Sequence, residues 1–202
     1  AQGAYIHNLS DFWDYYWKNP NGSDPEQLGW RLKYNRDNRG DIYATHGLGP
    51  VAQALNIHRG DRMTTLVAMD TKSVQGKQLV EERTGKPCTE FRNGDHTTTL
   101  IQTADRKVIE LQHDVMNPQP YSRLYQLTGT KGFANKYPVE GYAIDAKQLK
   151  ATGNAPKVDN LTSHSFMPDD QRKALEEKYE SPILKKFGKL AKEVGGHGGM
   201  DF

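Results

Sequence analysis

The chain of 202 residues has a single cysteine, Cys88, and lacks long apolar stretches. One thiol cannot form an internal disulfide bond, and it cannot supply a zinc site built from several thiolates. Gly85-Lys86-Pro87, which precedes the cysteine, predicts a turn, and this setting argues against a nucleophilic thiol. No apolar run approaches the roughly 20 residues that a membrane-spanning helix needs, so we expect no membrane partner.

An excess of charge of one sign is also missing. The 27 basic residues nearly balance the 25 acidic ones and leave a net charge of +2, which is too small to attract nucleic acid strongly. We therefore expect no nucleic-acid partner. With 35% hydrophobic and 26% charged residues, the composition is that of a folded domain and not of a disordered chain.

Sequence signatures of metal sites and of a serine nucleophile are absent. The chain has seven histidines, but it has no H-E-x-x-H motif and no two histidines four residues apart. His197 and Asp201 are four apart, and two ligands do not make a zinc site. No G-x-S-x-G elbow supports a serine triad. We predict no metal.

One segment imitates a dinucleotide-binding loop. Residues 47–52 match G-x-G-x-x-A, and Asp70 follows at about the expected distance of roughly 20 residues. The preceding residues 40–46 are half polar, whereas a first Rossmann strand is buried on both faces and apolar throughout. Pro50 also removes one N–H from the place where a pyrophosphate would bind. We favour a helix that begins at Pro50 over a nucleotide site.

The pattern of apolar residues predicts the fold class. Strands are expected over residues 4–9, 63–69, 97–103, 108–113 and 122–128, with turns at 104–107 and 129–132. Helices are expected over residues 50–56, 73–83, 168–179 and 182–194, and residues 35–41 are expected to form a polar loop. The apolar stripe of the last helix is expected to pack in a core. Strands in mid-chain with helices towards the end predict an α/β (α+β) fold, in which helices cover one face of an open, mostly antiparallel sheet.

Tyrosines and histidines in glycine-rich or aromatic surroundings are the candidate site residues. Tyr43 and His46 lie three apart directly before Gly47, and Tyr5 and His7 lie two apart on one face of a predicted strand. Such groups can converge on a ligand, although His46 taken alone is better explained as a helix cap or as a hydrogen-bonding residue of the core. Two further residues join the set: Arg31, which follows Trp30, and His197, which stands among four glycines where backbone can approach a ligand closely.

These fragments resemble the NAD-dependent α-N-acetylgalactosaminidases of glycoside hydrolase family 109, within the Gfo/Idh/MocA superfamily. The resemblance runs from residue 4 to residue 202 and is carried by the strings Ala4–Asn8, Trp30-Arg31, Tyr43–Pro50, Pro120–Arg123 and Gly196–Asp201. It implies that residues 1–202 are the C-terminal, substrate-binding and catalytic domain. An N-terminal Rossmann domain that holds NAD would then precede this chain, and we expect such a portion because the chain opens at Ala1 without a leader.

The resemblance also implies roles for residues. Tyr5, His7, Tyr43 and His46 are similar to catalytic residues of the family. Arg31, Tyr121 and His197 are similar to substrate-binding ones. The cofactor-binding residues belong chiefly to the missing domain.

The implied reaction uses a redox route. Ordinary glycosidases use two carboxylates, and no convincing carboxylate pair is evident in this sequence. Instead NAD oxidises C3 of the sugar, a base removes the proton at C2, the C1 substituent leaves, water adds, and the reduced cofactor restores C3. The implied partner is a terminal N-acetylgalactosaminyl glycan, and the isolated domain is expected to be inactive.

Two other functions stay open at this point. One is a sugar oxidoreductase of the same superfamily with net turnover of NAD, although no lysine stands out for that chemistry. The other is a non-catalytic carbohydrate-binding or dimerisation module, with self-association through the open face of the sheet. The resemblance suggests a bacterial enzyme, exported or periplasmic, and the sequence itself leaves the compartment undetermined.

Overall fold

The computed structural model describes residues 1–22, 27–144 and 166–193. The chain divides into two compact units, Ala1–Glu140 and Gly141–Phe202. No helix among the described residues has the length and apolar character needed to cross a membrane.

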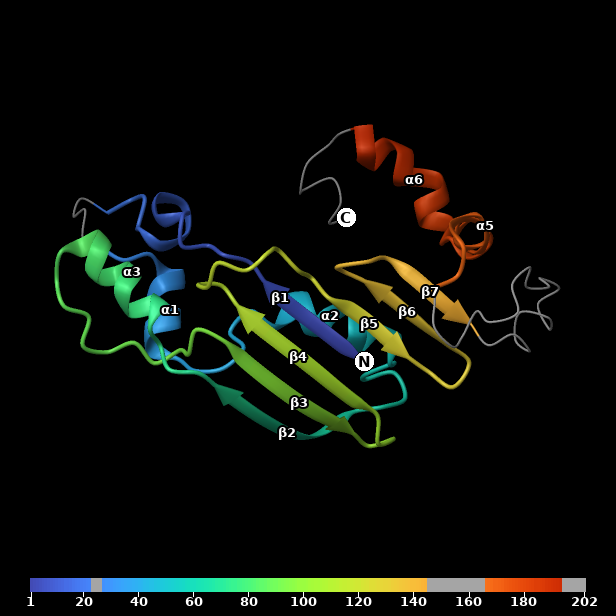
Figure 1. Ribbon diagram of the computed structural model, residues 1–202, viewed down its shortest axis with the longest axis horizontal. Coiled ribbons are helices and arrows are strands. Elements are labelled where there is room, and N and C mark those ends of the chain that lie inside the picture. The colour runs from blue at the N-terminus through green and yellow to red at the C-terminus, as the bar shows by residue number, and fades with distance from the viewer. Residues whose placement is uncertain (23–26, 145–165, 194–202) are drawn as a thin grey trace. The chain divides into compact units, whose positions relative to one another are not determined.

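Six strands of the first unit form a mixed sheet (Figure 1). They are β1 (Gln2–Ile6), β2 (Met63–Asp70), β3 (Thr97–Thr103), β4 (Val108–Asp114), β5 (Tyr125–Thr128) and β6 (Gly132–Lys136). Their order is β2-β3-β4-β1-β5-β6. β1 pairs with β4 in parallel, and the pairs β1–β5, β2–β3, β3–β4 and β5–β6 are antiparallel. The predicted fold class, an open and mostly antiparallel sheet, is confirmed.

Helix α2 (Ala44–Ala54) covers one face of this sheet, behind β1 and β5 in Figure 1. Its buried Val51 packs in a cluster with Ile101 of β3 and with Ile109 and Leu111 of β4. Along β3, buried residues alternate with more exposed ones, as the two-residue period of a half-buried strand requires. Leu100 therefore points to the opposite face and is 48% exposed.

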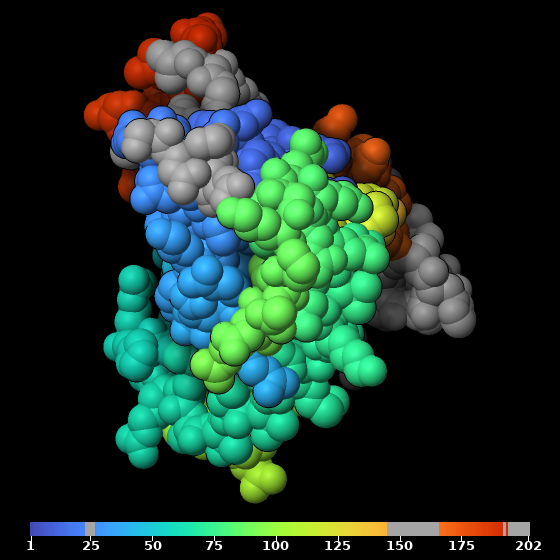
Figure 2. All heavy atoms as spheres, turned by 90° about the vertical axis from the view of Figure 1, so that its left-hand side faces the viewer, coloured from blue at the N-terminus to red at the C-terminus, as the bar shows by residue number. Residues whose placement is uncertain are grey.

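A larger core lies at the end of β1 and β4 where three further helices gather. These are the π-helix η1 (Trp13–Trp17), α1 (Trp30–Asp37) and α3 (Gln75–Thr84). Trp17 and Leu32 are buried at its centre, and the Trp17 indole N–H donates to the carbonyl of Leu9 over 2.7 Å. Figure 2 shows the segment that follows α3 lying against α1 on this side of the molecule, and the Arg92 N–H donates to the Arg36 carbonyl there.

Two sequence predictions for this unit are wrong. The helix predicted from Pro50 begins at Ala44 and contains Pro50 in its interior. The predicted polar loop over residues 35–41 is helical as far as Asp37, because α1 occupies its first part. In α1 tertiary contacts outweigh local preferences, since Asn35 is buried and receives a hydrogen bond from the Asn93 side chain.

The second unit contains β7 (Gly141–Ile144), α5 (Asp169–Tyr179) and α6 (Pro182–Glu193). The Ser181 hydroxyl accepts the N–H of Leu184 over 3.1 Å and caps α6, as its sequence predicts. The apolar stripe of α6 does not enter a core within this unit. Ile183, for example, is 69% exposed.

Candidate functional site

The approach of α2 to β1 builds the candidate site. Gly3 of β1 lies directly under Gly47 of α2, and a Cβ atom on Gly3 would overlap the Gly47 carbonyl. Only glycine permits this contact without a backbone shift. The start of α2, with Tyr43 at the N-cap and His46 in the first turn, is thereby held against β1.

Tyr5 of β1 is the centre of the resulting ring cluster. It is 5% exposed, and its ring stacks on Tyr43 with centroids 5.1 Å apart. The His46 ring packs edge-on against the Tyr5 and Tyr43 rings, with ring centroids 4.4 and 5.0 Å apart. Residues three apart at a helix start share one side, so both reach the same strand residue.

His7 extends the cluster beyond the end of β1. Its Nδ1 atom lies 3.1 Å from the Tyr5 hydroxyl oxygen, and its ring contacts Tyr121 at 4.8 Å in an edge-on arrangement. We call Tyr5, His7, Tyr43, His46 and Tyr121 the tyrosine–histidine cluster. The structure thus brings together five of the seven candidate residues; it does not test their catalytic and binding roles.

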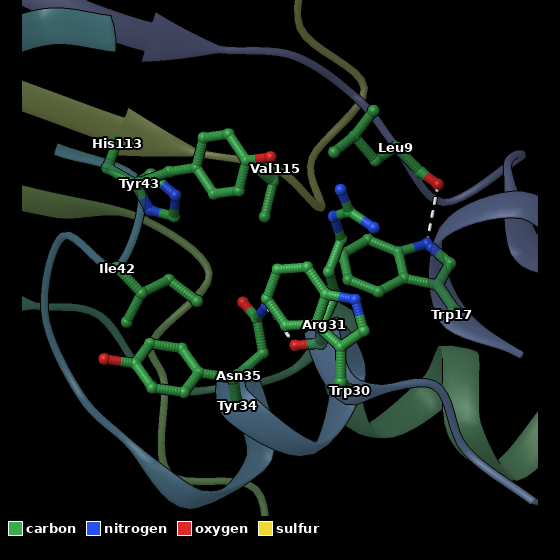
Figure 3. A pocket seen from close by; sticks show the side chains of 10 residues that line it. All are labelled: Leu9, Trp17, Trp30, Arg31, Tyr34, Asn35, Ile42, Tyr43, His113 and Val115. Carbon is green, nitrogen blue, oxygen red and sulfur yellow. Dashed lines mark hydrogen bonds between the residues drawn. The ribbon is translucent and has the colours of Figure 1, made fainter. Parts of the chain in front are cut away.

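The other two candidates are placed differently. Arg31 makes no ring contact with the cluster; its guanidinium lies over Tyr16 and Trp30, at 5.0 and 4.4 Å from the ring centroids. It shares a cavity of about 250 Å³ with Tyr43 (Figure 3). His197 lies outside the described residues.

Burial affects the protonation of Tyr5. Burial, reinforced by the neighbouring Tyr43 and Tyr16, raises the pKa of the Tyr5 hydroxyl. The phenol therefore keeps its proton at neutral pH and can donate it to Nδ1 of His7. Tyr5 is therefore a hydrogen-bond donor at the centre of the cluster, and the imidazoles that contact it, His7 and His46, are the groups whose side-chain type suits proton transfer near neutral pH.

His113 is a pocket residue that the sequence reasoning missed. It lies on β4 opposite Tyr5 of β1, with ring centroids 6.4 Å apart, and lines the same cavity as Arg31 and Tyr43. Burial lowers the pKa of its imidazole to about 4, and the nearby Asp114 opposes this shift only in part. Side chains alternate between the two faces of a strand, and His113 follows the buried Leu111 by two residues. The sequence could therefore have placed His113 on the inner face of the sheet.

The segment that matches the dinucleotide-binding motif, residues 47–52, is helical and does not form a loop. Residues 47–52 lie inside α2, so they do not form the strand-to-helix turn that holds a pyrophosphate. Gly47 instead allows the close contact with Gly3, whereas Gly49 has open space around it. Among the described residues no group of three or more His, Cys, Asp or Glu side chains is arranged to hold a metal ion.

Comparison with known proteins identifies the family of the chain. A family described as "Glycosyl hydrolase 109, C-terminal domain" matches residues 1–202. Glycosyl hydrolase family 109 protein 5 of Phocaeicola vulgatus is 74% identical over 202 residues, which are 100% of this chain and 38% of the relative. Glycosyl hydrolase family 109 protein 1 of Bacteroides thetaiotaomicron is 52% identical over the whole chain and 41% of its own length. The chain therefore spans about two fifths of the curated relatives it matches.

Proposed function

The chain belongs to glycosyl hydrolase family 109, and from this we propose that it is the substrate-facing domain of an NAD-dependent glycosidase that removes terminal α-N-acetylgalactosamine. Activity would belong to the full-length protein. The observation that carries the proposal is the convergence of Tyr5, His7, Tyr43 and His46 into one cluster from two separate elements.

Each residue of the cluster has a proposed task. His46 and Tyr43, both partly buried at the start of α2, would move protons at the reacting carbons of the sugar. Tyr5 would hold them in place by ring contacts and would donate a hydrogen bond to His7. Tyr121, 38% exposed, would line the outer side of the sugar site. Arg31 would bind the sugar from the neighbouring cavity.

NAD would supply a reversible oxidation of the sugar when it is bound. The described residues suit proton transfer and sugar binding, and residues 47–52 are helical and offer no pyrophosphate loop. We therefore assign the binding of NAD chiefly to the part of the full-length protein outside this chain. The domain's own contribution would be to orient the sugar.

The full-length protein tests this proposal directly. It should release the chromophore from a chromogenic α-N-acetylgalactosaminide without net accumulation of NADH. Net accumulation would favour a sugar oxidoreductase instead. Replacing His46 by Ala should reduce turnover far more than sugar affinity, and a variant with both near wild type would remove His46 from the reaction.

The isolated chain provides a second check. Titration with NAD should show no saturable binding near micromolar concentrations, and the chain should be catalytically inactive alone. Saturable micromolar binding would contradict the assignment of the cofactor to the rest of the protein.

The open face of the sheet favours a second role, self-association. Val67, Leu100 and Val108 are 60%, 48% and 50% exposed there. Exposed apolar patches of this kind mark interaction surfaces. Sedimentation should show an oligomer that dissociates in a Leu100→Lys variant and persists in a Leu66→Lys control, because Leu66 pairs with Ile101 on the other face. A wild-type monomer would contradict this role.

A further inference from the structure

The cavity next to the tyrosine–histidine cluster combines apolar walls with unpartnered polar groups. Its volume is about 250 Å³, near the lower end of the roughly 300–1,000 Å³ typical of ligand sites. Its apolar side chains include Leu9, Trp17, Ile42 and Val115 (Figure 3). Tyr43 belongs both to this cavity and to the cluster, so a sugar held by the cluster would extend a substituent into the cavity.

His113 is the most unusual group in the lining. It is 1% exposed, and neither ring nitrogen has a hydrogen-bond partner among the described residues. Most buried polar side-chain atoms in folded proteins have a partner, so an imidazole with two unpartnered nitrogens points to a ligand that would pair with at least one of them. With a pKa of about 4 the ring is neutral at pH 7, and it offers one N–H donor and one acceptor nitrogen.

Arg31 adds a second unpartnered donor. Its Nε atom is buried without a hydrogen-bond partner, while its guanidinium lies over the rings of Tyr16 and Trp30. The stacking holds the planar group in one orientation, as guanidinium–aromatic pairs do. Asn35 uses one of its two Nδ2 N–H groups on the Arg31 carbonyl, 2.9 Å away, and its Oδ1 atom accepts from the Asn93 side chain.

A secondary amide is the group that complements this set. Its carbonyl accepts from N–H donors, its N–H donates to the acceptor nitrogen of a neutral imidazole, and its methyl group fits an apolar wall. A carboxylate would use the donors but would leave the imidazole acceptor nitrogen without a proton to bind. A hydroxyl offers no methyl group for the apolar side chains.

We propose that this cavity holds the acetamido substituent of the sugar, with His113 and Nε of Arg31 as the hydrogen-bonding partners of its amide. The inference rests on the proposed function, which places the sugar ring on the cluster beside Tyr43. It adds His113 as the residue that distinguishes a 2-acetamido sugar from a sugar with a plain hydroxyl at that carbon.

Binding measurements on the full-length protein test the proposal. Calorimetric titrations would compare N-acetylgalactosamine, galactose and galacturonic acid. Wild type should prefer N-acetylgalactosamine to galactose by tenfold or more, since a site with unpaired polar groups rejects a ligand that cannot pair them. The variant His113→Leu should reduce this preference by about tenfold, and His113→Asn, which keeps one donor and one acceptor, should retain part of it.

Thr97→Val is the matched control. Thr97 lies opposite His113 in the β3–β4 pair, is 1% exposed and has an unpartnered hydroxyl, but it does not line the cavity. This variant should keep the wild-type preference. Equal losses for N-acetylgalactosamine and galactose in His113→Leu, or an equal loss of preference in Thr97→Val, would overturn the proposal.

Tighter wild-type binding of galacturonic acid would overturn it as well, because the cavity would then be an anion site. Hydrolysis of a chromogenic α-N-acetylgalactosaminide is measured separately. A protein that binds the amide sugar selectively through His113 but does not hydrolyse the glycoside would refute the proposed function and support this inference. A protein that hydrolyses the glycoside, but whose preference for N-acetylgalactosamine does not depend on His113, would support the proposed function and refute this inference.

Discussion

Replacing His113 by Leu should change how stability depends on pH. The folded-state pKa of His113 is about 4, whereas an unfolded histidine titrates near its ordinary value of 6.5. Because the folded pKa is lowered, the unfolded state binds the proton more readily below pH 6.5. The contribution of His113 to stability is therefore intact above that pH and is lost as pH falls towards 4. With these two pKa values, the free energy of unfolding should fall by about 2 kcal/mol between pH 7 and pH 5 through His113 alone.

Urea unfolding of wild type, His113→Leu and Thr97→Val at pH 7 and pH 5 measures this effect. Every other titrating group is common to the three proteins, so the difference between wild type and His113→Leu isolates the imidazole. At pH 7 the leucine variant should be as stable as wild type or more stable, because an apolar side chain replaces an unpartnered polar one. At pH 5 its advantage should grow by about 2 kcal/mol. Parallel pH profiles for wild type and His113→Leu would refute the claim that the ring is buried and neutral.

Three other variants test the construction of the site. Gly3→Ala should destabilise the protein by about 1–3 kcal/mol in urea unfolding, since the new methyl group overlaps Gly47, and an unchanged midpoint would contradict the close packing. Asp95→Ala should cost about 1–2 kcal/mol in the same assay, because the Asp95 carboxylate accepts three N–H groups at the start of α3; no loss would show that the cap is dispensable. Tyr5→Phe in the full-length protein removes the hydroxyl contact with His7 and keeps the ring contacts, so turnover should fall about tenfold or more with little change in thermal stability. Wild-type turnover would exclude a role of that hydroxyl in proton transfer.

Local periodicity accounts for the parts of the fold that were predictable. The β3–β4 hairpin follows from two alternating stretches around residues 104–107, and the cap of α6 follows from Ser181 before Pro182. Helix α1 escaped prediction because only Leu32 and Asn35 of its residues are buried, so no apolar stripe marks it. The true start of α2 escaped because Pro50 imitates a first-turn residue, while the contact between Gly3 and Gly47 joins positions far apart in the sequence.

The candidate site was predictable in pairs but not as a whole. Strand alternation pairs Tyr5 with His7, and helical spacing pairs Tyr43 with His46. That the two pairs meet depends on tertiary packing, which the sequence alone conveyed only through its family resemblance. His113 was missed because its significance lies in the absence of hydrogen-bond partners, a property of the folded environment.

The central claim is that the tyrosine–histidine cluster binds the sugar. NMR spectra of the full-length protein with labelled histidines, recorded during titration with N-acetylgalactosamine, test it most directly. Signals of His7 and His46 should shift with saturation, and the signal of the exposed His58 should stay in place. Saturable binding that leaves His7 and His46 unshifted would contradict the account.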